Sequence, residues 1–166
     1  MDYYTRDIKK SDLDDIHEYM TKPEVSKYQT CGVTSYEETK NYIDEMLNRD
    51  EHCMFNVIVD ADIDKVIGSI QLEHDMNNKS GEIEFVIHPD YWGNGIATDV
   101  ANTMIKYGFK VLKLNRIWAQ THINNTASEI VLQKLDMKHE GILRQNVLLD
   151  DEYRDTLLYS ILKEEF

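Results

Sequence analysis

Two glycines separated by one residue, Gly93 and Gly95, stand between a strand-like segment and a strongly apolar helical pattern that begins at Ile96. Glycine allows a backbone to approach a ligand closely and to adopt positive φ. The first turn of a helix presents N–H groups without intrahelical partners and the positive end of the helix dipole, and both attract phosphate. The segment is therefore a candidate phosphate-binding loop. The alternative interpretation is a glycine-rich turn that binds nothing.

Two well-known phosphate-binding motifs do not account for this loop. The sequence contains no GxxxxGK[ST], which excludes a P-loop NTPase. It contains no GxGxxG either, and the strand before the loop follows a hairpin instead of opening a βαβ unit. The loop therefore calls for a phosphate-bearing cofactor of another kind.

The elements around the loop alternate between strands and helices. Helices are expected after Ser11, whose hydroxyl would cap a segment closed by Pro23, and after the capping box of Ser35 and Glu38. Two more are expected at 96–112 and 126–135. Expected strands cover 3–8, 54–60, 65–74, 82–88, 116–123, 139–148 and 154–162. The hairpins among them predict one α+β or mixed α/β domain over residues 1–166 with a largely antiparallel sheet.

The loop and its flanks resemble the GNAT acetyltransferase superfamily. Residues 92–97, Trp-Gly-Asn-Gly-Ile-Ala, are similar to its coenzyme A pyrophosphate loop, Q/R-x-x-G-x-G/A. Trp92 stands where Gln or Arg is usual, a replacement common in the branch resembling ribosomal-protein N-terminal acetyltransferases. Residues 81–89, the Asn-x-x-Ser of 125–128, and residues 140–144 and 153–155 also match that branch, in the right order. The likeness spans nearly the whole chain.

This resemblance implies a GNAT-type acyl-CoA N-acyltransferase fold and acetyl-CoA as co-substrate. The mixed, mostly antiparallel sheet would have a central strand, 82–88, splayed from its parallel neighbour, 116–123. An N–H group in the splayed strand could polarise the thioester carbonyl. By the same resemblance, the pantetheine arm would pair with backbone groups of Val86, Ile87 and His88. The loop that begins at Trp92 would bind the pyrophosphate through the N–H groups of Gly93, Asn94, Gly95, Ile96, Ala97 and Thr98.

The resemblance also supplies candidates for the acid and the base of acetyl transfer. Glu82 matches the strand glutamate of the family, and is the candidate base. Glu84 lies on the same face, roughly 6.6 Å further along, and could share that role or act through water; the alternative for both is a solvated acidic face. Ser128 matches the residue proposed to protonate the departing thiolate. Asn125 would contact the pantetheine or position the thiol, although both residues also suit a helix start.

The sequence departs from the family pattern in three places. Asn94 stands where Lys, Arg or Gln is common, so phosphate binding would rest on backbone donors. Asp136 and Met137 replace the usual Gly-Phe that follows the helix. Leu132 occupies the position of the tyrosine acid that many GNAT enzymes carry. That phenol is therefore missing from the expected acid position.

Composition narrows the classes of partner. The 166 residues include 31 acidic and 18 basic side chains, a net charge of -13, which repels nucleic acid and suits cationic partners. Cys31 and Cys53 form no Cys/His cluster, so neither zinc nor any other metal is expected. With so few cysteines, we expect the protein to reside in a reducing compartment. The N-terminus has no signal-peptide pattern and no apolar stretch is long enough for a bilayer. We therefore expect a cytoplasmic protein with no membrane partner.

These observations together predict an acetyl-CoA-dependent N-acetyltransferase that modifies a primary amine. By resemblance, the favoured acceptor is a protein N-terminal amine. A polyamine or another small amine is the alternative, which the acidic surface also suits. A non-catalytic acyl-CoA sensor on the same scaffold is the alternative from another class. Two further expectations are that the closing hairpin could pair its edge in a homodimer and that Cys31 could line the acceptor pocket.

Overall fold

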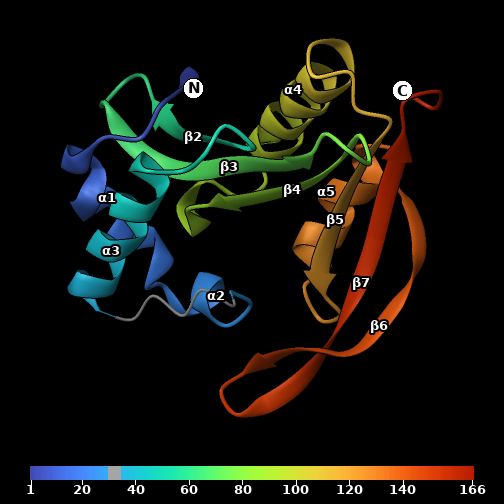
Figure 1. Ribbon diagram of the computed structural model, residues 1–166. Coiled ribbons are helices and arrows are strands. Elements are labelled where there is room, and N and C mark those ends of the chain that lie inside the picture. The colour runs from blue at the N-terminus through green and yellow to red at the C-terminus, as the bar shows by residue number, and fades with distance from the viewer. Residues whose placement is uncertain (30–34) are drawn as a thin grey trace. The chain divides into compact units, whose positions relative to one another are not determined.

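The computed structural model describes residues 1–29 and 35–166 (Figure 1). The strands are β1 (Tyr3–Arg6), β2 (Cys53–Asp60), β3 (Lys65–Asp75), β4 (Ser80–Ile87), β5 (Arg116–His122), β6 (Lys138–Leu149) and β7 (Glu152–Leu162). The helices are α1 (Leu13–Met20), α2 (Pro23–Ser26), α3 (Tyr36–Leu47), α4 (Ile96–Lys110) and α5 (Thr126–Lys134), with 3-10 turns η1 (Lys10–Asp12) and η2 (Pro89–Tyr91).

The strands form a mixed sheet in the order β1-β2-β3-β4-β5-β7-β6. β1 with β2, β5 with β7, and β6 with β7 are antiparallel, whereas β4 and β5 are parallel. The parallel pairing is registered only over Ser80–Glu82 against Arg116–Trp118, although β4 continues to Ile87 and β5 to His122. The predicted fold class, a mostly antiparallel sheet with a central parallel pair that separates along its length, is confirmed.

The chain divides into two compact units, residues 1–71 with 85–96 and residues 72–84 with 97–166. β3 and β4 contribute residues to both, because each strand runs across a division point. In the first unit, α1 and α3 lie beside each other (Figure 1) and pack on an apolar cluster. That cluster consists of Ile8, Ile16, Tyr19, Met20, Ile43, Phe55, Val57, Val59 and Val66. Burying these side chains is the main source of stability for this unit.

The start of α1 differs from the prediction. Ser11 lies inside η1, and the cap position belongs to Asp12. The Asp12 carboxylate is buried and accepts two hydrogen bonds from Arg6, both 2.8 Å, and one from the Lys9 N–H, also 2.8 Å. This part-buried bidentate pair fixes the turn ahead of the helix, and it is not part of any capping pattern that the sequence shows.

Pro23 begins α2 instead of merely closing the helix before it. Proline is well tolerated at a first helical position, where its missing N–H has no intrahelical partner to lose. The other predicted cap is confirmed: Ser35 Oγ accepts from the Glu38 N–H at 3.2 Å, and Glu38 Oε2 accepts from the Ser35 N–H at 2.8 Å. Local capping chemistry therefore predicted the start of α3 correctly.

In the second unit, α4 lies close to β5. A Cβ added at Gly108 of α4 would lie 2.8 Å from Ile117 Cδ1, so the helix packs closely on β5 at this position and a larger residue would shift the Ile117 side chain. β6 and β7 form a long hairpin at the C-terminal end (Figure 1). Two register shifts interrupt it, between His139 and Gly141 and between Leu143 and Val147.

The turn after α5 shows how Asp136 takes the place of the glycine in the family pattern. Asp136 has φ 57°, a left-handed conformation that glycine usually supplies. The Asp136 N–H donates to Gln133 O at 3.1 Å and the Met137 N–H donates to Leu132 O at 3.2 Å. The helix end is therefore closed as a glycine would close it, because aspartate tolerates this conformation better than most residues.

Candidate active site

The loop between β4 and α4 is ordered by its own side chains. Gly93 and Gly95 both have φ 79°, and a Cβ added at either would meet no atom within 4 Å. Asn94 Nδ2 donates to Tyr91 O at 3.1 Å and to Trp92 O at 3.3 Å. The Asn94 side chain therefore holds the loop together, while both glycines leave their backbone open to an approaching group. This open backbone at the start of α4 fits a pyrophosphate.

Trp92 ties this loop to the end of β4. Its indole Nε1–H donates to Ile87 O at 2.7 Å, although 45% of the residue is exposed. In the position where the family pattern has Gln or Arg, the indole supplies a donor to the strand and an apolar surface to solvent. Trp92 therefore supports the loop from within the chain.

The backbone at the end of β4 is already partly engaged. The His88 N–H donates to Ile67 O at 2.8 Å, and His88 O accepts from the Tyr91 N–H at 2.9 Å. Both backbone groups of His88 thus have partners inside the protein. N–H groups alternate in direction along a strand, so the Val86 N–H points toward β3 as the His88 N–H does, and Ile87 is the residue whose N–H we retain for that role.

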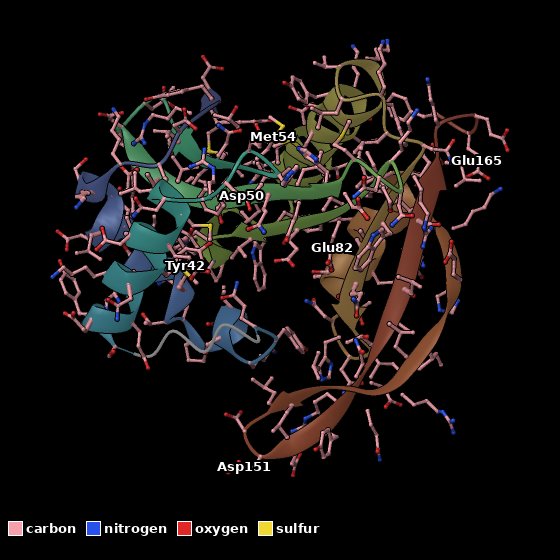
Figure 2. All side chains as sticks on the ribbon, in the orientation of Figure 1. Tyr42, Asp50, Met54, Glu82, Asp151 and Glu165 are labelled. Carbon is pink, nitrogen blue, oxygen red and sulfur yellow. The ribbon has the colours of Figure 1, made fainter. Side chains whose placement is uncertain are left out.

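Glu82, the candidate base, is labelled in Figure 2, and its pKa is raised. Burial raises the pKa of Glu82 to about 7, and the negative charges of Glu84 and Glu73 add to the increase. The pKa of Glu84 is raised as well, first by the protein packed around it and then by Glu73, even though Glu84 keeps accessible surface. A carboxyl with a pKa near 7 exchanges its proton readily at neutral pH, as a general base must.

Sequence reasoning missed Glu73 and Trp118. The polar turn at 76–79 joins β3 to β4, and counting back from it places Glu73 opposite Glu82. On the other side of β4, the parallel register places the half-buried Trp118 beside Glu82. Strand alternation and hairpin counting could have found both residues, because directly opposed residues share a face of the sheet.

Asn125 and Ser128 lie together at the start of α5. Asn125 is the N-cap: its Oδ1 accepts from the Ser128 N–H at 3.2 Å, and its Nδ2 donates to Ser128 Oγ at 3.0 Å. The capping interpretation of Asn125 is therefore confirmed. Because the Ser128 hydroxyl accepts this bond, its own proton stays available for donation. Leu132, further along α5, is buried with 1% exposure.

Other predicted features fall outside these groups. Cys31 lies outside the described residues. In the described ranges, His, Cys, Asp and Glu side chains form no group of three or more that could hold a metal ion. No helix in the same ranges has the length and apolarity needed to span a membrane.

The raised pKa of Glu82 predicts that the stability of the folded protein depends on pH. The folded protein retains a proton on Glu82 that the unfolded chain loses, so stability falls as pH rises from about 4.5 to about 7 and is level above that. Glu82→Gln cannot lose this proton. We expect the free energy of unfolding of the variant to exceed that of the wild type by about 1–2 kcal/mol at pH 8, after allowance for the partial exposure of the carboxyl group. Near pH 4.5 the two free energies should differ little.

Urea unfolding of both proteins from pH 4.5 to 8 measures this difference. Glu45→Gln, at an exposed position of α3, is the matched control for removing one negative charge. A stability difference between wild type and Glu82→Gln that stays constant over this pH range would show that Glu82 does not titrate near neutrality.

Comparison with known proteins agrees with this geometry. Residues 4–138 match the family model described as an acetyltransferase (GNAT) domain. The chain belongs to the GNAT acetyltransferases. Among its relatives is an uncharacterized N-acetyltransferase, YnaD, of Bacillus subtilis (strain 168), 29% identical over 161 residues, which make up 97% of this chain and 94% of YnaD.

Solved structures of GNAT enzymes have the same fold. A ribosomal-protein-S5-alanine acetyltransferase from Vibrio fischeri superposes with a TM-score of 0.84 at 23% identity, covering 98% of this chain and 94% of that one. A spermidine N-acetyltransferase from Vibrio cholerae in complex with CoA and spermine gives 0.83 at 22% identity, with coverage of 98% and 96%. At this identity the likeness shows the fold, and the family membership rests on the match of residues 4–138 to the family model.

Proposed function

We propose that this GNAT enzyme transfers the acetyl group of acetyl-CoA to a primary amine, with Glu82 as the general base. The observation that carries the proposal is the pKa of about 7 at Glu82, on the strand that leads into the glycine loop. The open backbone of Gly93 and Gly95 supports a bound pyrophosphate. In this proposal both compact units serve one catalytic domain over residues 1–166.

Starting from the acceptor ammonium, the reaction removes two protons from the nitrogen and supplies one proton to the sulfur. Glu82, directly or through a water shared with Glu84, takes a proton from the acceptor ammonium, and the neutral nitrogen attacks the thioester carbon. A carbon–nitrogen bond forms and the carbon–sulfur bond breaks, with the developing oxyanion accepting from the N–H of Ile87. Ser128 gives its hydroxyl proton to the departing thiolate and regains a proton from the nitrogen as the amide forms, and Asn125 orients that hydroxyl through the 3.0 Å bond.

The pKa of Glu82 favours a protein N-terminal amine as acceptor. An α-amine has a pKa of about 7.7–8.0, so transferring its proton to Glu82 is uphill by about one pKa unit, or about 1.4 kcal/mol. A lysine-like aliphatic amine, with a pKa of about 10.4, requires more than three units, or over about 4 kcal/mol. The relative that acts on a ribosomal-protein alanine supports the same acceptor class.

A polyamine is the second candidate, because Glu73 and Glu84 add negative charge beside Glu82. After burial, the negative charges of Glu84 and Glu73 are what raise the pKa of Glu82, and a polycation near these glutamates would be attracted. The relative solved with CoA and spermine supports this alternative. A polyamine would also lower the pKa of Glu82 on binding, since its positive charge favours the carboxylate.

Three acceptors distinguish these candidates when thiol release is measured under the same conditions. The first is a peptide with a free N-terminus and no lysine, the second is that peptide with a blocked N-terminus and one lysine, and the third is spermidine. We expect the first to have the highest kcat/KM, by about tenfold or more. A highest value with spermidine would assign the polyamine activity instead, and acetyl-CoA binding without turnover on a broader amine panel would indicate a sensor.

A cytoplasmic location and a homodimer stay predictions.

A further inference from the structure

We infer that the imidazole of His88 is a positioning residue for the cofactor loop, acting through one hydrogen bond to the backbone of Asp90. The inference rests on the proposed function, because it assigns a role toward acetyl-CoA. The evidence is the set of contacts that surrounds the ring. All of them lie within the first compact unit.

The first contact is on the loop side. His88 is buried, with 1% exposure, and its Nδ1 accepts from the Asp90 N–H at 3.1 Å, which makes His88 the N-cap of η2. The Tyr91 ring meets the imidazole edge-on, with centroids 5.6 Å apart and planes at 87°. The ring therefore holds the first residues of the loop that leads to Gly93.

The second contact fixes the ring itself. His88 Nε2 lies 3.1 Å from Glu18 Oε1, on α1. Because Nδ1 accepts a bond, the hydrogen-bond network assigns the proton of the neutral ring to Nε2, which donates to Glu18. Hydrogen bonds from Lys65, at 2.7 Å, and from His88 lower the pKa of Glu18 to about 2. A permanently charged carboxylate thus keeps the imidazole in the tautomer that the loop requires.

These contacts preorganise the residues that precede the glycines. Tyr91 OH donates to Asp60 Oδ2 at 3.0 Å, which anchors η2 to the end of β2. Trp92 and Asn94 hold the next turn through their bonds to Ile87, Tyr91 and Trp92. A loop with two left-handed glycines loses considerable backbone entropy when it orders around a ligand. Ordering it beforehand, from Glu18 through His88 to Asp90, lowers that cost at the binding step.

Two variants of His88 test the roles of the two ring nitrogens separately. In His88→Asn, the side-chain oxygen replaces Nδ1 and can still accept from the Asp90 N–H. In His88→Gln, the side-chain nitrogen replaces Nε2 and can still donate to Glu18, but the loop bond is lost. We expect His88→Gln to raise the KM for acetyl-CoA by about three- to tenfold with kcat little changed, the effect of one hydrogen bond, and His88→Asn to stay within about twofold of wild type.

Hydrogen exchange at the Asp90 amide gives a readout that needs no cofactor. Exchange should be faster in His88→Gln than in His88→Asn, while thermal unfolding reports the stability of each variant. Equal KM values in both variants, or KM values that follow stability instead of Asp90 protection, would overturn the inference and leave the proposed function standing. Absence of acetyl-CoA binding to the wild type would instead end the proposed function, and this inference with it.

Discussion

Glu82→Gln should lower kcat/KM for the amine acceptor by about 10²- to 10⁴-fold, the usual contribution of a positioned general base. In the wild type, kcat/KM should fall as pH drops below about 7, since Glu82 becomes protonated and can no longer accept a proton. The glutamine variant should lose this limb of the profile and retain only the limb that belongs to the acceptor amine. Steady-state thiol release from pH 5.5 to 9 measures both effects.

Glu84→Gln provides the matched variant two residues along β4. It removes a negative charge that raises the pKa of Glu82, so the acidic limb should move to lower pH while turnover at pH 8 changes much less than in Glu82→Gln. Acetyl-CoA affinity should be close to that of the wild type in both variants. Unchanged kinetics in Glu82→Gln would remove Glu82 from the mechanism.

Gly95→Val should weaken acetyl-CoA binding by more than about 100-fold. The added side chain would project into the open space beside the loop, and φ 79° at this position disfavours any residue with a Cβ. Displacing the cofactor from two charge-assisted N–H contacts costs about 3–6 kcal/mol. Isothermal titration with acetyl-CoA measures the change.

Gly141→Val on β6 is the control for this substitution. A Cβ at Gly141 also meets no atom within 4 Å, and its φ lies outside the left-handed region. We expect wild-type affinity for acetyl-CoA in this variant. If Gly95→Val bound acetyl-CoA normally, the assignment of the glycine loop to the pyrophosphate would be wrong.

Much of the fold could be predicted because its signals are local. Alternating and helical apolar patterns placed the strands and the main helices within a few residues, and the Ser35–Glu38 capping box placed the start of α3. The wrong start of α1 came from the part-buried pair of Arg6 with Asp12, which places Asp12 and not Ser11 at the cap position. The prediction that Pro23 closes the first helical segment agrees with the end of α1 at Met20, but it omitted α2, because a proline that follows one helix can also begin the next.

The candidate site was predictable in part. The glycine loop has a sequence signature, and the residues of that signature are the ones that the structure leaves open. The electrostatics of Glu82 depend on Glu73, which belongs to another strand, and the role of His88 depends on Glu18, seventy residues away in the chain. A histidine at a strand end shows neither its burial nor its partners until the chain has folded.

The central claim is that the protein binds acetyl-CoA and transfers its acetyl group to an amine. The most direct test titrates the purified protein with acetyl-CoA by calorimetry and then adds the peptide with a free N-terminus, with mass spectrometry of the product. The proposal predicts saturable binding, followed by a peptide heavier by one acetyl group at its N-terminal amine and release of one thiol per product. Absence of acetyl-CoA binding would contradict the account, because the loop at Gly93 and Gly95 would then be a turn without a ligand.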